Sequence, residues 1–290
     1  MSYPEGLREQ VEAYLGALRF SDEPATQGLE EAMRYSLLAG GKRIRPVLAL
    51  ATASALGRPP ADVLPLAAAL ELIHTYSLIH DDLPAMDDDE LRRGRPTCHV
   101  KYGEDVAILA GDGLYAEAFR HLLGNQPGEP AHVLAAAAEL AVATGVNGMV
   151  GGQYIDVRNL VPEGEVTLRR LHQLKTGRLI QASVECVLLL TIGPDASSRL
   201  PDFRAFAAEL GLLFQIVDDI LDVTGTEDAL GKPQGSDERH GKLTYVSHYG
   251  IDDARRMAAE SHDNARQALD RAGVAAELQQ ITDFIFTRSS

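Results

Sequence analysis

Residues 212–222 read Leu-Leu-Phe-Gln-Ile-Val-Asp-Asp-Ile-Leu-Asp, a short acidic run inside an apolar segment. Gln215, Asp218, Asp219 and Asp222 recur at i, i+3, i+4 and i+7, so a helix places them on one face and the apolar residues elsewhere. Unpaired carboxylates on an apolar helix lose hydration and repel one another. The segment therefore predicts a helix whose polar stripe faces a cation.

The same helical spacing of apolar residues runs through most of the chain, whereas sustained two-residue alternation is hard to find. This pattern predicts an all-α fold. We expect helices at residues 4–20, 26–40, 43–57, 61–83, 103–124, 130–152, 166–191, 202–224, 243–271 and 275–287. No composition break marks a boundary, so residues 1–290 are expected to form a single domain.

Composition excludes several classes of function. The net charge of −15 disfavours nonspecific attraction to nucleic acid or to an anionic membrane surface. Cys98 and Cys186 lie far apart and outside any metal-ligand spacing, which fits a reducing compartment. The N-terminus does not resemble a secretory signal, and the longest apolar stretch, around 187–192, is shorter than the roughly 20 residues that a bilayer requires. We expect a cytoplasmic protein without membrane insertion.

A second acidic run occupies residues 81–89, Asp-Asp-Leu-Pro-Ala-Met-Asp-Asp-Asp. Asp81 and Asp87 are six residues apart, which an ideal helix would place on different faces, but a break at Pro84 could bring Asp87 back toward Asp81. Mg²⁺ is usually held by one or two carboxylates plus substrate phosphates. The alternative is that each run is a solvated helix end. Two such runs, each preceded by hydrophobic residues, favour one shared site for Mg²⁺ and a polyphosphate.

Basic residues stand beside glycine in four short motifs: Gly-Gly-Lys-Arg-Ile-Arg-Pro at 40–46, Arg-Arg-Gly at 92–94, Lys-Thr-Gly at 175–177 and Gly-Lys at 231–232. Arginine offers bidentate phosphate contacts and lysine a compact charge. Lys42 and Arg45, three residues apart, can converge on one phosphate. For any one of these cations a solvated surface role is the alternative. The loops at 84–102 and 224–241, which follow the acidic runs, have the length and composition of lids.

Taken in order, these motifs resemble those of the short-chain trans-isoprenyl diphosphate synthases, and are most similar to the bacterial type of farnesyl diphosphate synthase. The resemblance spans nearly the whole chain. It rests on residues 40–46, 73–82, 91–94, 151–156, 175–177, 214–222, 231–232 and 241–245.

The resemblance implies a helical bundle around a deep central cavity, usually in a homodimer. It implies Mg²⁺-dependent condensation of isopentenyl diphosphate with the allylic dimethylallyl or geranyl diphosphate. Three Mg²⁺ ions per site would act with substrate bound, and Mn²⁺ could substitute. By resemblance, the metal ligands are Asp81, Asp87 and Asp218 with the support of Asp82; the allylic diphosphate ligands are Arg92, Lys175, Thr176, Gln215 and Lys232; the isopentenyl diphosphate ligands are Lys42, Arg45, His74 and Arg93.

Tyr76 is the candidate determinant of product length. It lies five residues before Asp81, about 7.5 Å farther along a helix at 1.5 Å per residue, where a large side chain can stop a growing hydrocarbon. Ser77 is small and leaves Tyr76 as the main barrier. The resemblance agrees with a farnesyl (C15) product. A core tyrosine without this role, a geranylgeranyl (C20) or geranyl (C10) product, a terpene cyclase and a noncatalytic synthase subunit are the alternatives.

Overall fold

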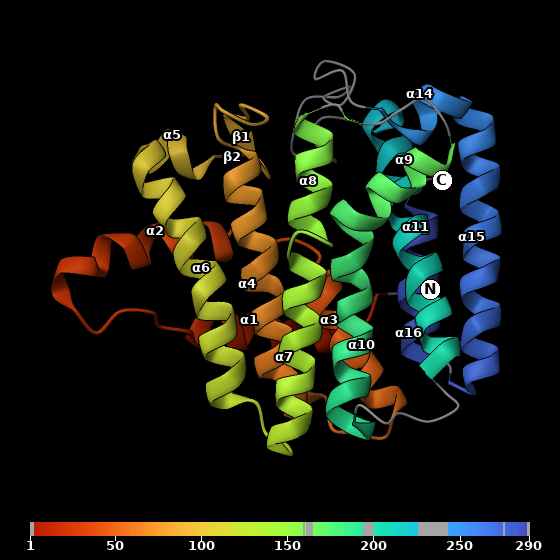
Figure 1. The fold of residues 1–290 in the computed structure, drawn as a ribbon, viewed down its shortest axis with the longest axis horizontal. Coiled ribbons are helices and arrows are strands. Elements are labelled where there is room, and N and C mark those ends of the chain that lie inside the picture. Colours follow the sequence, from red (N-terminus) through yellow and green to blue (C-terminus); the bar gives the residue numbers. More distant parts are fainter. Residues whose placement is uncertain are drawn as a thin grey trace.

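The computed structural model describes residues 3–158, 160, 165–193, 200–225, 243–274 and 276–288. Over these residues the chain is a bundle of roughly parallel helices, shown in Figure 1. The helices are α1 (Glu5–Ala17), α2 (Gln27–Leu37), α3 (Ile44–Ala55), α4 (Leu64–Asp81), α5 (Cys98–Tyr102), α6 (Glu104–Asn125), α7 (Pro130–Thr144), α8 (Met149–Val157), α9 (Glu165–His172), α10 (Arg178–Ile192), α11 (Leu200–Thr224), α14 (Tyr245–Tyr249), α15 (Ile251–Ala272) and α16 (Ala276–Thr287). The expected all-α fold is confirmed.

Three of the expected helices are interrupted in ways that the spacing of apolar residues did not predict. The stretch at 243–271 divides into α14 and α15 at Gly250, whose φ is 83°. The stretch at 130–152 divides into α7 and α8 around Gly145 and Gly148, where the chain turns so tightly that a Cβ on Gly148 would lie 2.0 Å from the Ala143 carbonyl oxygen. The stretch at 166–191 contains a π-helix, Gln173–Gly177, between α9 and α10. Single-turn π segments in longer helices are frequent at functional sites.

The expected loop at 84–102 contains a short hairpin in which each strand has two residues. Strand β1 (Leu91–Arg92) pairs with β2 (Arg95–Pro96), and α5 follows. Arg93 and Gly94 in its turn both have positive φ, 54° and 71°, as a type I′ turn requires. The hairpin stands at the end of the bundle beside the C-terminal end of α4 (Figure 1).

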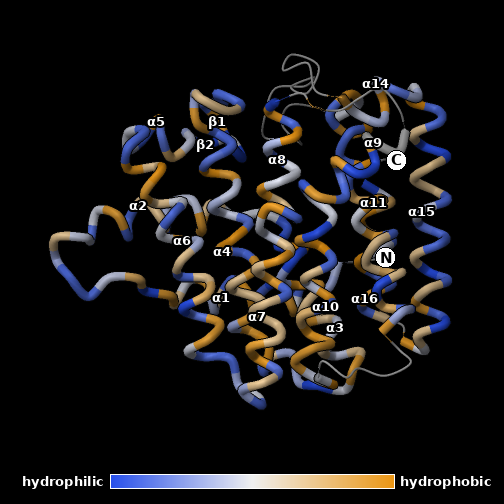
Figure 2. The backbone as a smooth tube through the Cα atoms, in the orientation of Figure 1, coloured by the Kyte–Doolittle hydropathy of each residue, from blue (hydrophilic) through white to orange (hydrophobic). Residues whose placement is uncertain are grey.

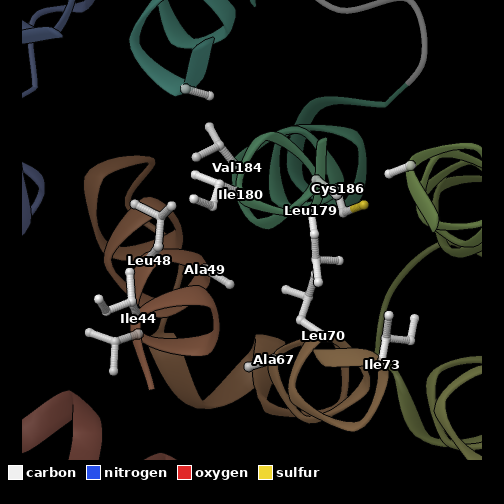
Figure 3. Packing of buried hydrophobic residues seen from close by; sticks show 14 of the residues in the cluster. Ile44, Leu48, Ala49, Ala67, Leu70, Ile73, Leu179, Ile180, Val184 and Cys186 are labelled. Carbon is white, nitrogen blue, oxygen red and sulfur yellow. The ribbon is translucent and has the colours of Figure 1, made fainter. Parts of the chain in front are cut away.

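The core lies where α3, α4 and α10 meet. Figure 3 shows Leu48 from α3, Leu70 from α4 and Ile180 from α10 directed into the same space, and none of the three is exposed to solvent. Hydrophobic residues gather in α3, α7 and α10, whereas the outer helix α15 is largely hydrophilic (Figure 2). Burial of the apolar helix faces provides the main driving force for this packing.

Among the described residues, two helical stretches are long and apolar enough to cross a bilayer by length and composition alone, although the sequence predicted no apolar stretch of that length. They are Pro60–Asp81, whose apolar window is 72% buried, and Pro130–Val157, whose window is 44% buried. The core helix of a soluble protein passes the same test, so this is weak evidence for a membrane span. The second stretch leaves an apolar face uncovered.

Candidate functional site

A cavity of about 1150 Å³ opens between α3, α4, the β1–β2 hairpin, α8, the π-helix, α11 and the end of α16. Most of the predicted site residues line it: Lys42, Arg45, His74, Tyr76, Ser77, Asp81, Arg92, Arg93, Lys175, Thr176, Gln215 and Asp218. Lys232 lies outside the described residues. Asp82 and Asp87 do not line the cavity, although Asp87 lies close to a residue that does.

The first acidic run leaves the helix where Pro84 predicts a break. Helix α4 ends at Asp81, and the chain turns back so that the Asp87 N–H donates to the Asp81 carbonyl oxygen at 2.9 Å. Asp88 adopts a positive φ of 53° in this turn. The backbone therefore returns Asp87 to the neighbourhood of Asp81, as the sequence analysis anticipates.

Asp82 directly follows the last residue of α4 and does not line the cavity. It is 3% exposed, and the Arg92 Nε donates to its Oδ1 at 2.6 Å. Burial raises the pKa of Asp82 to about 6, against the opposing effect of the Arg92 guanidinium. The structure thus places Asp82 as the anchor of Arg92 and not among the carboxylates that face the cavity.

The second acidic run is also divided. Asp218 lines the cavity, but Asp219 and Asp222 are only 1% and 3% exposed. Asp219 accepts hydrogen bonds from Gln215 Nε2 and from the Tyr245 N–H, both at 2.7 Å. Asp219 therefore orients Gln215 and fastens the start of α14 to α11. The expectation that all four polar residues share one cation-facing stripe is wrong for Asp219 and Asp222.

These carboxylates suit Mg²⁺. Asp81 and Asp218 reach one cavity from α4 and α11, and carboxylate oxygen is the hard donor that Mg²⁺ prefers. Over the described ranges no three Asp, Glu, His or Cys side chains converge closely enough to hold a metal by themselves. Two carboxylates that reach one cavity suit a Mg²⁺ site in which substrate phosphates complete the oxygen shell.

A cationic wall faces the carboxylates. Burial lowers the pKa of Arg45 to about 10, and its buried Nε has no hydrogen-bond partner among the described residues. Burial also lowers the pKa of Arg93, and burial together with the nearby guanidinium groups holds the pKa of His74 well below its ordinary value. Lys42 is exposed at the edge of this wall. Clustered cations with unmet donors fit an anionic ligand.

Arg43 holds the chain between Lys42, in the segment before α3, and Arg45, in the first turn of α3. Arg43 has a left-handed backbone, with φ of 53°, and its guanidinium is buried. It donates to Glu71 Oε1 at 2.6 Å, to Glu12 Oε1 at 2.9 Å and to the Leu37 carbonyl at 2.7 Å. Burial acts to lower the pKa of Arg43, but the two carboxylates outweigh it and raise the pKa. The bonds from Arg43 to the two carboxylates fix the backbone between Lys42 and Arg45.

Arg93 is positioned by close packing against the same loop. Its guanidinium donates to the Gly40 carbonyl and lies against Gly41, where an added Cβ would be 2.7 Å from the Arg93 Cζ. Gly41 also has a φ of 126°, a conformation that L side chains rarely adopt. The two glycines of the motif therefore admit Arg93 to the cavity wall.

On the opposite wall, the π-helix presents Lys175 and Thr176. Lys175 Nζ lies 2.5 Å from Asp156 Oδ2 of α8. The two elements touch through Gly152, since a Cβ there would lie 2.3 Å from the Lys175 backbone nitrogen. Asp156 lies in the 151–156 motif but had no predicted role. In the structure it pairs with Lys175 and so orients that side chain.

Other residues of the cavity wall had no predicted role, although Gln153 lies in the 151–156 motif. Gln153 lines the cavity, and neither its Nε2 nor its Oε1 has a partner among the described residues, although both are buried. The sequence feature that could have pointed to Gln153 is the pair of glycines, residues 151–152, that precedes it. Phe284 of α16 and Arg288, which follows that helix, also line the cavity, and Lys42 Nζ lies 5.6 Å from the centroid of the Phe284 ring. No local motif pointed to these two, because only the packing of α16 brings them there.

Tyr76 is among the residues that line the cavity and is 9% exposed. Its ring meets Tyr115 of α6 edge to face, with centroids 5.1 Å apart. Beside it, the Ser77 hydroxyl donates to the His74 carbonyl at 2.9 Å, so this small side chain is folded back on its own helix. The geometry leaves the tyrosine ring as the larger obstacle.

Comparison with known proteins agrees with this site. The family model for polyprenyl synthetase matches residues 26–282. The farnesyl diphosphate synthase of Geobacillus stearothermophilus is 44% identical over 299 residues, covering 99% of this chain and 98% of the relative. The chloroplastic geranylgeranyl pyrophosphate synthase of Capsicum annuum is 46% identical over 268 residues, covering 90% of this chain and 72% of the relative.

A solved structure extends the similarity to three dimensions. The geranyltransferase of Helicobacter pylori, complexed with magnesium and isoprenyl diphosphate, superposes with a TM-score of 0.84 at 33% identity, covering 99% of this chain and 97% of that one. The matched family model, the full-length relatives and the shared fold lead to one conclusion: the chain belongs to the polyprenyl synthetase family and is a prenyltransferase.

Proposed function

We propose that the protein condenses isopentenyl diphosphate head to tail with dimethylallyl and then geranyl diphosphate, giving farnesyl diphosphate and releasing diphosphate. The observation that carries this proposal is a single cavity lined by carboxylates from two helices, by cations from several elements and by Tyr76. Full-length similarity to a farnesyl diphosphate synthase supports the same product class.

The two diphosphates are assigned to separate walls. We assign the allylic diphosphate to Arg92, Lys175, Thr176, Gln215 and Lys232, and the isopentenyl diphosphate to Lys42, Arg45, His74 and Arg93. Asp81, Asp87 and Asp218 would hold Mg²⁺, and Asp82 would act through Arg92. When bound, Mg²⁺ supplies positive charge that stabilises the departing diphosphate.

The residues of the site then act on charge and position. Arg92 and Lys175 stabilise the negative charge that develops on the leaving diphosphate as the allylic C–O bond breaks. The oxygens of Thr176 and Gln215 stabilise the allylic cation, with Gln215 oriented by its bond to Asp219. Arg45 and His74 hold the second substrate so that its alkene meets the cation before water does. The released diphosphate is the proposed acceptor of the final proton.

A terpene cyclase also uses acidic Mg²⁺ sites, but it has no need for the second cationic wall around Arg45 and Arg93. A geranylgeranyl product is the main alternative, because the Capsicum annuum relative is named for that activity. We take Tyr76, a large side chain in the cavity wall, to favour the shorter C15 product.

Product analysis tests the proposal. The purified protein is incubated with Mg²⁺, labelled isopentenyl diphosphate and either dimethylallyl or geranyl diphosphate, and the products are dephosphorylated and sized. We expect C15 from both starters and loss of turnover with EDTA. A C20 main product would overturn the C15 assignment. Turnover of the starter alone to a cyclic hydrocarbon would favour the cyclase.

We also infer a homodimer through the uncovered apolar face of α6–α8. Ile108 and Leu109 of α6, Val142 of α7, Val146 and Tyr154 are between 44% and 80% exposed. Light scattering on protein eluted from a size-exclusion column should give twice the chain mass. Val146→Lys should shift the measured mass toward that of the monomer. A wild-type monomer at micromolar concentration would contradict the dimer.

The cytoplasmic location and the absence of membrane insertion are part of the same proposal. Both Cys98 and Cys186 are buried and unpaired, in keeping with a reducing compartment. Fractionation of cells that express the full chain should recover it in the supernatant after ultracentrifugation, and recovery in the membrane pellet after a high-salt wash would refute this.

A further inference from the structure

We propose that Tyr115 is a second floor of the hydrocarbon end, placed behind Tyr76, and that it sets the product length once the Tyr76 ring is removed. This inference rests on the proposed condensation and deepens it, because it names a further specificity-determining residue. Tyr115 belongs to α6, a helix that carries none of the residues assigned to the two diphosphates.

The two tyrosines lie in series. Tyr76 lines the cavity, whereas Tyr115 does not and packs on the Tyr76 ring, so the second ring stands behind the first. Their ring planes are inclined at 80° with centroids 5.1 Å apart. Helices α4 and α6 approach closely here, since a Cβ on Gly111 would lie 2.2 Å from the His80 Nε2. Little room therefore separates the first floor from the second.

Tyr115 is held in place from two sides. Thr144, fully buried on α7, donates its hydroxyl hydrogen to the Leu140 carbonyl at 2.9 Å. The Tyr115 hydroxyl, 3.4 Å from the Thr144 oxygen, is then the donor in their contact. Phe119, one turn farther along α6, packs on the Tyr115 ring with centroids 5.3 Å apart. A growing chain that reached Tyr115 would have to displace a braced ring.

The spacing of the rings sets the expected products. A ring separation of 5.1 Å is close to the length that one isoprene unit adds to an extended chain. Truncating Tyr76 should therefore admit one more unit and stop at C20 against Tyr115. Truncating both should let elongation continue to C25 and beyond. Truncating Tyr115 alone should leave C15, because the first floor still stands.

The test compares Tyr76→Ala, Tyr115→Ala, Tyr76→Ala/Tyr115→Ala and the control Tyr76→Ala/Phe119→Ala. Each is incubated with Mg²⁺, geranyl diphosphate and excess labelled isopentenyl diphosphate, and the products are sized. We expect C20 from the single Tyr76 variant and from the control, and mainly C25 or longer from the double tyrosine variant. Tyr76→Ala/Tyr115→Leu, which keeps an apolar contact with Phe119, serves if the double alanine variant does not melt cooperatively.

The inference fails if the double tyrosine variants stop at the same length as Tyr76→Ala, or if the Phe119 control lengthens the product equally. It also fails if Tyr76→Ala alone already passes C20. Absence of any condensation product from the wild type would instead overturn the proposed function. The variants therefore test the inference about Tyr115, and the wild-type protein tests the proposed function.

Discussion

The replacement Glu71→Ala probes how the protein holds its cationic wall. Glu71 is 2% exposed and accepts a 2.6 Å hydrogen bond from Arg43, whose guanidinium is equally inaccessible to solvent. Arg43 in turn fixes the backbone between Lys42 and Arg45. The variant leaves a buried guanidinium with Glu12 and one carbonyl as its remaining partners.

The size of the effect follows from burial. Removing one partner of a buried ion pair costs about 3–5 kcal/mol, and the contact with Glu12 should keep the loss near the lower value, about 3 kcal/mol. Glu12 is 30% exposed in its own contact with Arg43, so solvent screens it and Glu12→Ala should cost about 1 kcal/mol or less. At about 2 °C per kcal/mol for a chain of this size, Glu71→Ala should lower Tm by about 6 °C.

Urea unfolding followed by circular dichroism measures the free-energy change, and initial rates measure the KM for isopentenyl diphosphate. We expect Glu71→Ala to raise that KM severalfold and the KM for geranyl diphosphate much less, because Arg43 supports only one wall. Glu71→Gln keeps the shape and one acceptor, and should fall between wild type and alanine. A loss below about 1 kcal/mol, or one no larger than that of Glu12→Ala, would refute this account.

Other predictions concern the metal, the packing and the pH dependence. Asp81→Ala and Asp218→Ala should each lose most of kcat at unchanged far-ultraviolet circular dichroism; wild-type turnover in either would sink the two-helix metal site. Gly152→Ala should lower stability by about 1–3 kcal/mol, because its Cβ would meet backbone, whereas Gly124→Ala, with open space around it, should be neutral or stabilising in thermal melts. Burial lowers the pKa of His172 from 6.5 to about 4. Between these two pH values the imidazole is protonated in the unfolded chain and neutral in the folded one. Stability should therefore fall by about 3 kcal/mol as pH drops from 6.5 to 4, and His172→Asn should remove that part of the slope in urea unfolding; an unchanged slope would contradict it.

The positions of the long helices could be predicted from the sequence, but the interruptions within them could not. Apolar spacing identified every long helix, because a helix that packs in a bundle must present an apolar face. The break between α7 and α8 and the π-helix at 173–177 left the spacing almost unchanged, so they gave no periodic signal. They matter to the site, since they set Lys175 beside Asp156 and bring Gly152 against the π-helix.

The sequence by itself determined the class of fold, the presence of two acidic runs and the basic motifs near them, because each depends on residue type and local spacing. Helical spacing alone could not separate Asp81 from Asp82, or Asp218 from Asp219; only the resemblance to a family singled out Asp81 and Asp218. Neighbouring residues on a helix point about 100° apart, and which of those directions is the cavity depends on the helices that pack around it. Only the tertiary structure turned one aspartate of each pair toward the cavity and gave the other a buried partner of its own.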